Sequence, residues 1–219
     1  MESSGSRRAR RVTPLSVASI VEAALEILDA SGEGALTFRV LAERLQTGPG
    51  AIYHHVANKQ DLLAIVSTEL MQSAVAHVDD GVDGIVELRR LLLNVFDAID
   101  AHPWVGSQLA AAPWQGPVMT LFEAIGVRLD ALPVPARHQF SAASALVNFV
   151  LGVAAQYASA ARVTSDRADL LTSVAARWQG EQYPFTSRVS AQLADHDDRQ
   201  QFAEGVDFLL AGIRGNAVP

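Results

Sequence analysis

Small and polar residues follow one another near the N-terminus in the order that a DNA-reading helix requires. Pro49, Gly50 and Ala51 could open such a helix, because small side chains let a backbone approach base edges closely. Side chains able to bind phosphate groups lie around them: Arg39, Tyr53, His55 and Lys59. The chemistry indicated is DNA binding. The same pattern also fits an ordinary helical hairpin within a larger bundle, and the residue types alone leave both interpretations open.

Local signals define the elements that would position these residues. Thr37 can cap a helix over 38–45, and Gln46-Thr47-Gly48 can form a turn. Pro49 suits the first position of a helix to about residue 55, where its missing N–H does no harm. Asn58, with Asp61 three residues later, caps a helix from 59 to about 78. With a preceding helix, capped by Ser16 and ended by Ser31-Gly32, the segment 37–63 predicts a helix-turn-helix.

Three blocks in this region resemble the tetracycline-repressor (TetR/AcrR) family of bacterial transcriptional regulators. They are IVEAALEILDASG, LTFRVLAERL and AIYHHVANKQDLL, the last being the most specific. The resemblance implies an all-α fold, with an N-terminal three-helix DNA-binding domain and a C-terminal helical domain for ligand binding and dimerisation. Two departures stand out. Gln46-Thr47 replaces the usual Gly-Val, which we expect to loosen the turn, and Gly50 lies inside the recognition helix, where it lowers helix stability.

The resemblance also implies a role for each candidate residue. Arg39 would contact a base or a phosphate from the second helix. The segment 48–51 would face the groove, and His54 would either contact DNA or be solvated. Phosphate contacts are implied for Tyr53, His55 and Lys59.

Charge and composition limit the function classes. The chain has 219 residues and a net charge of -7, yet residues 1–63 are neutral, so the acidity lies in the C-terminal part. Local charge decides nucleic-acid binding, so the acidic total does not exclude it. With no cysteine, disulfides and Cys-type zinc sites are excluded, and a cytoplasmic location is favoured. We expect a basic flexible arm at 1–13, a DNA-binding domain at 14–62 and a helical domain at 63–219. The arginines at 7–11 form either a solubilising tail or an arm that contacts DNA.

The C-terminal part reads as helices at 85–101, 118–131, 136–162, 166–179 and 198–213, with a short one between Pro103 and Pro113. The segment 101–122 has no charge and is broken by prolines, which favours a cavity wall. We therefore expect a mostly apolar ligand pocket, although a core with a satisfied polar network fits the same residues. The candidate lining residues are Phe96, His102, Trp104, Trp114, Phe122, Asn148, Gln156, Tyr157 and Trp178.

The helix expected at 136–162 is apolar or small on nearly all sides, and residues 139–161 carry no charge. That length could span a bilayer, but its glutamines, serines and alanines favour a buried helix of a soluble protein. Such a helix needs covering, so one face should meet a second copy of the chain. We expect the last helix to join it, so that two helices from each chain form a four-helix interface. The apolar residues of that last helix lie at helical spacing: Phe202, Val206, Leu209, Leu210 and Ile213.

Enzyme motifs are missing from the sequence. It contains no G-x-S-x-G, H-E-x-x-H, P-loop or G-x-G-x-x-G pattern. Adjacent His54 and His55 diverge on a helix, and His77 with Asp79 and Asp80 would bind a metal only weakly. We expect no enzyme activity, metal or cofactor. The sequence predicts a dimeric repressor that binds a palindromic operator and is released by a small, mainly apolar molecule. The alternative is a helix-turn-helix regulator without such a ligand, acting as an activator or through a protein partner.

Overall fold

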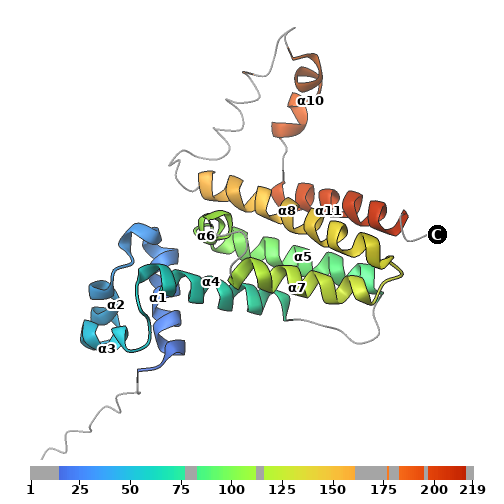
Figure 1. Cartoon of the computed structure of the whole chain (residues 1–219). Coiled ribbons are helices and arrows are strands. Elements are labelled where there is room, and N and C mark those ends of the chain that lie inside the picture. Colours follow the sequence, from blue (N-terminus) through green and yellow to red (C-terminus); the bar gives the residue numbers. More distant parts are fainter. Residues whose placement is uncertain are drawn as a thin grey trace, which may run out of the picture. The chain divides into compact units, whose positions relative to one another are not determined.

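The structure, a computed structural model, describes residues 15–76, 83–111, 116–160, 177, 183–194 and 197–215 (Figure 1). Every regular element within these ranges is a helix, so the predicted all-α class is confirmed. Contacts divide the chain into two compact units, Met1–Leu62 and Leu63–Pro219. The boundary falls within α4 (Lys59–Val75), which therefore contributes residues to both units.

The first unit contains α1 (Val17–Ala35), α2 (Phe38–Arg44) and α3 (Pro49–Tyr53), together with the start of α4. The Ser16 hydroxyl accepts the Ser19 N–H at 3.2 Å, and the Ser19 hydroxyl accepts the Ser16 N–H at 3.0 Å, so the predicted cap is a reciprocal box. Gly32 has φ +72°, which interrupts α1 at the predicted glycine, although helical turns resume to residue 35. The core is formed by Ile20, Ala24, Leu28, Leu36, Leu41 and Ile52.

In the part that the structure describes, the second unit contains most of α4 and six further helices. They are α5 (Gly84–Ala101), α6 (Val105–Ala111), α7 (Gly116–Asp130), α8 (Ala136–Ala160), α10 (Pro184–Ala194) and α11 (Asp198–Gly215). Helices α5, α7, α8 and α11 lie side by side along their lengths, and α6 packs against α8 (Figure 1). Prolines stand at or just before several of these starts, as the sequence predicted. The helix predicted at 166–179 lies outside the described residues except for residue 177, and α10 was not predicted.

Three ion pairs connect α5 with α11 in antiparallel order. Asp83 pairs with Arg214 at 3.4 Å, Arg89 with Asp207 at 2.7 Å and Asp97 with Arg199 at 2.6 Å. The hydrogen bond from Arg89 holds the pKa of Asp207 below its ordinary value. Each pair is exposed and individually weak. Their alternating sign nevertheless opposes sliding of one helix along the other, because sliding would bring like charges together.

Helix α6 approaches α8 unusually closely at one glycine. A Cβ atom built on Gly106 would lie 2.2 Å from the carbonyl oxygen of Ala154. Only a residue without a side chain fits there, so Gly106 allows the two backbones to touch.

Helix α8 leaves much of its surface uncovered within one chain. Within the described residues it is the one helix long and apolar enough to span a membrane by length and composition, and 28% of the relevant window is buried. Phe140 near its start is exposed, and most of its other exposed positions beyond that residue are small or polar: Ser141, Ala145, Asn148, Gly152, Ala155 and Gln156. The single chain therefore leaves uncovered a face of the helix that the sequence predicts to meet a second copy of the chain.

Candidate nucleic-acid interface

The turn between α2 and α3 is tightly hydrogen-bonded. Gln46 adopts the left-handed conformation with φ +52°, and its N–H donates to the Glu43 carbonyl at 3.2 Å. The Thr47 N–H donates to the Ala42 carbonyl at 2.9 Å. These two bonds form a Schellman motif, in which glycine usually takes the left-handed position. The expectation that Gln46-Thr47 loosens the turn is therefore wrong, and the consequence of losing glycine is instead a strained backbone at Gln46.

The start of α3 is exposed and almost without side chains. Gly48 is the N-cap residue in extended conformation, and Pro49 takes the first helical position, as predicted. Gly48, Pro49 and Gly50 are exposed, and a Cβ atom on either glycine would meet no atom within 4 Å. Ile52 is fully buried beneath this surface. The helix is thus anchored on its inner side and open to a close-approaching backbone or base on its outer side.

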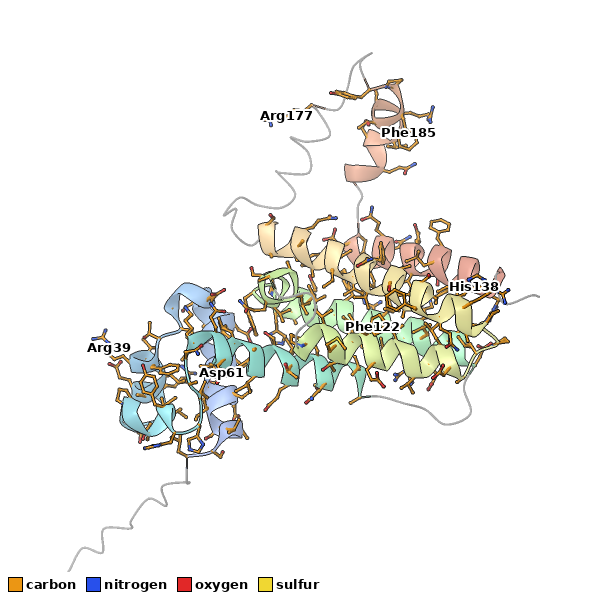
Figure 2. The ribbon with its side chains drawn as sticks, viewed as in Figure 1. Arg39, Asp61, Phe122, His138, Arg177 and Phe185 are labelled. Atoms are coloured by element: carbon orange, nitrogen blue, oxygen red, sulfur yellow. The ribbon has the colours of Figure 1, made fainter. Side chains whose placement is uncertain are left out.

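Polar side chains surround this exposed start. Arg39 projects from α2 with 84% of its side chain exposed and forms a 3.9 Å ion pair with Glu43 (Figure 2). Tyr53 is 57% exposed, and its ring packs edge-on against Phe38 at 4.6 Å between centroids, which orients the ring. His54 and His55 are both exposed at the end of α3. Hydrogen-bond donors therefore flank a nearly bare helix start, a combination suited to the phosphates beside a DNA groove.

Lys59 has a structural partner that the sequence did not predict. Its ammonium Nζ donates to the Glu33 carbonyl at 2.6 Å in a partly buried contact, which connects the start of α4 with the last turn of α1. The predicted cap at Asn58 is present, since its Oδ1 accepts the Asp61 N–H at 2.9 Å. An ammonium group has three N–H donors, so the bond to Glu33 leaves donors for a second acceptor.

The candidate ligand residues separate into several groups. Phe96 is buried against Phe202, and Tyr157 donates its hydroxyl proton to Asp198 at 3.1 Å. His102 and the buried Trp104 lie 6.5 Å apart between ring centroids, beyond the end of α5. Others lie elsewhere: Asn148 and Gln156 are exposed on α8, and Trp114 and Trp178 are outside the described residues.

Phe122 lies in a groove between α7 and α8. Its ring centroid is 6.0 Å from that of Phe140, which is 67% exposed. The groove has a volume of about 260 Å³ and includes two carboxylates, Glu123 and Asp130. No group of three or more His, Asp or Glu side chains in the described part of the chain is placed to hold a metal ion. His77, Asp79 and Asp80, considered above as a weak metal site, lie outside that part.

Both parts of the chain match models of known families. Residues 20–66 match "Bacterial regulatory proteins, tetR family", and residues 85–216 match "Tetracyclin repressor-like, C-terminal domain". An HTH-type transcriptional regulator of Saccharopolyspora erythraea is 28% identical over 207 residues, covering 90% of this chain and 84% of that protein.

Solved structures give the same result. The transcriptional regulator SCO7222, a TetR from Streptomyces coelicolor, is 41% identical with a TM-score of 0.82, covering 93% of this chain and all of that one. ActR from Streptomyces coelicolor, solved in complex with actinorhodin, shares the fold at 24% identity and a TM-score of 0.74, covering 94% and 100% of the two chains. The family models, the relatives and the exposed α3 agree: this chain is a transcriptional regulator of the TetR family.

Proposed function

We propose that this protein is a cytoplasmic, dimeric repressor that binds a near-palindromic operator and is released by a small, mainly apolar molecule. The observation that carries the proposal is the exposed start of α3, anchored by buried Ile52 and by the hydrogen-bonded turn at Gln46. Residues 14–62 form the DNA-binding domain in this account, and residues 63–219 form the regulatory and dimerisation domain.

The first step is entry of α3 into the major groove. Gly48, Pro49, Gly50 and Ala51 contribute little side-chain bulk, so base edges approach the backbone closely. Phosphates on either side receive hydrogen bonds from Tyr53, His55 and the remaining donors of Lys59. His54 lies at the same exposed helix end and adds a further donor. Arg39 projects from α2 and contacts a base or a phosphate at the edge of this surface.

Dimerisation is the second step, because one recognition helix reads only half a palindrome. Phe208 on α11 is 79% exposed. Beside it, α8 and α11 form an apolar hollow of about 300 Å³, which the small residues Ser141, Ala142, Ala145 and Gly212 help to line. A large exposed ring beside a hollow suits a two-fold interface, since each chain contributes both parts. The uncovered face of α8 supports the same interface. In a two-fold dimer bound to a palindrome, the two α3 helices would lie one turn of DNA apart.

Release by a ligand is the third step. ActR, which shares this fold, was solved in complex with actinorhodin, and this supports ligand binding by the present chain. We assign the ligand site to its C-terminal domain. The candidate apolar contacts in this chain are buried Phe96 and Trp104 and half-buried Phe122 and Tyr157, which lie in separate groups. His102 supplies a polar contact near Trp104. To weaken operator binding a hundredfold, a ligand must favour the non-binding conformation by about 2.7 kcal/mol, an ordinary allosteric coupling energy.

Binding to the DNA upstream of the protein's own gene tests the proposal. Fluorescence anisotropy should give specific binding that disappears when the half-sites are scrambled. Arg39→Ala should weaken operator binding by about 1–3 kcal/mol if Arg39 contacts a base, while Arg199→Ala, a matched exposed arginine in the second unit, should bind like the wild type. Specific binding that survives scrambling would contradict the proposal. A broad ligand screen that changes no operator affinity would leave the regulator without a ligand, acting as an activator or through a protein partner.

A further inference from the structure

Helix α7 carries a buried arginine that bonds to the end of α4. Arg128 is only 8% exposed, which is rare for a charged residue. Its Nη1 donates to the carbonyl of Ala124 at 2.9 Å, within its own helix. Its Nη2 donates to the carbonyl of Val75, the last residue of α4, at 3.3 Å. The guanidinium therefore spans from α7 to the C-terminal end of α4.

The burial of the Arg128 guanidinium costs free energy, and its position at the end of α4 offsets part of that cost. Burial lowers the pKa of Arg128, and the carboxylate of Glu87 on α5 acts in the opposite direction. The side chain of Glu87 is itself only 12% exposed and is 3.4 Å from Arg90. Burying a guanidinium is unfavourable unless it makes good hydrogen bonds. The last carbonyls of a helix have no partner within the helix and form its negative end, so a cation there is stabilising.

A second contact joins α7 to α4 at Thr68, which lies seven residues before Val75 in α4. A Cβ atom on Gly116 would lie 2.6 Å from Oγ1 of Thr68, so α7 begins directly against that side chain. The Thr68 hydroxyl donates to the Ala64 carbonyl at 2.7 Å, which fixes its orientation. Residues 68 and 75 lie two turns apart on one face of α4. Helix α7 therefore touches α4 at two levels, once near each of its own ends.

We infer that Arg128 is a positioning residue for operator recognition, which holds α4 along α7 and so fixes where α4 carries the DNA-binding domain. The inference rests on the proposed function. The cap at Val75 opposes sliding of α4 along its axis, and the close contact at Thr68 opposes its rotation. One residue of sliding moves a helix by about 1.5 Å. Because residues 59–62 of α4 belong to the first unit, a displacement of α4 along its axis also displaces that part of the first unit.

Distance measurement tests the inference without any ligand. The chain has no cysteine, so spin labels can be placed at Glu43→Cys on α2 and Glu123→Cys on α7, both exposed. Doubly labelled protein is mixed with excess unlabelled protein, so that pulsed electron resonance reports the distance within one chain. We expect a narrow distribution of label-to-label distances in the protein that retains Arg128, and a broadened or displaced distribution in the Arg128→Met variant. Arg128→Lys should restore it in part, because an ammonium group still donates to a carbonyl.

Operator binding provides the second readout. Arg128→Met should weaken specific binding at least tenfold while leaving non-specific binding within twofold, since the phosphate-contacting residues are unchanged. Arg214→Met, which removes a surface ion pair of the same unit, serves as the matched control and should behave like the wild type. Gly116→Ala disturbs the other contact and should also displace the distance distribution.

Two results would overturn the inference. One is a wild-type distance distribution in both Arg128→Met and Gly116→Ala. The other is a loss of specific and non-specific binding together, in proportion to the unfolded fraction, as a purely structural role predicts. If the wild-type protein bound no palindrome, the proposed function would fail, and the distance measurement would still decide whether Arg128 positions α4.

Discussion

Replacing Gly106 by alanine tests how closely α6 packs on α8. The new methyl carbon would lie 2.2 Å from the carbonyl oxygen of Ala154 and 3.0 Å from the carbonyl carbon. The obstacle is the backbone of a long helix, so no side chain can rotate away and α6 itself must move. Overpacking of this kind destabilises by about 1–3 kcal/mol, and a contact this short belongs at the upper end.

The same substitution at Gly126 serves as the control. Gly126 lies inside α7, and a Cβ atom there would meet nothing within 4 Å. Both substitutions gain about 1 kcal/mol of helix propensity, so only the clash distinguishes them. We expect Gly126→Ala to be more stable than the wild type by somewhat under that amount, and Gly106→Ala to be less stable by about 1–2 kcal/mol.

Thermal unfolding followed by far-ultraviolet circular dichroism measures the difference at a fixed protein concentration. For a domain of this size, 1 kcal/mol corresponds to about 2–4 °C in Tm. Gly106→Ala should therefore melt below the wild type and Gly126→Ala above it. A Gly106→Ala protein as stable as Gly126→Ala would show that the two backbones do not touch, and the packing of α6 described above would be wrong.

Three further substitutions test separate features. Gln46→Gly should raise the urea midpoint, because it removes a left-handed backbone strain of about 1 kcal/mol; an unchanged or lower midpoint would refute the turn geometry. Lys59→Met should lower stability by about 1.5 kcal/mol by removing the bond to Glu33, and in a titration of operator affinity against salt it should reduce the slope by about 0.9 per subunit. A changed slope with unchanged stability would argue against the bond to Glu33. Phe208→Asp should sediment as a monomer, whereas Phe185→Asp, at a similarly exposed phenylalanine, should remain dimeric; a dimeric Phe208→Asp would reject the proposed interface.

The elements of the first unit could be predicted because their signals are local. The caps at Ser16, Thr37 and Asn58 are side chains bonded within three residues, so sequence position alone defines them. Gly32 and Pro49 act through their own backbone restrictions. The bond from Lys59 to Glu33 joins residues 26 positions apart, and no local pattern predicts it.

The second unit was harder to predict, for a physical reason. Helix α8 is apolar or small nearly all round, so its sequence does not define which side faces the core. Asn148 and Gln156 were consequently expected near a ligand but lie on the surface. Arg128 resembles an ordinary basic residue in a last helical turn. Its burial depends on where α4 ends against α7, which only the tertiary structure defines.

Hydroxyl-radical footprinting of the operator complex tests the central claim, recognition of a palindrome by paired α3 helices, most directly. If paired α3 helices read a palindrome, two protected patches should lie on one face of the duplex, centred about 10 base pairs apart, around two successive major grooves. Gly50→Trp places an indole ring in the open space on the outer side of α3, where the groove would lie. It should abolish both patches together, without lowering Tm. A single protected patch, or a footprint unchanged by Gly50→Trp, would show that paired α3 helices do not read the operator.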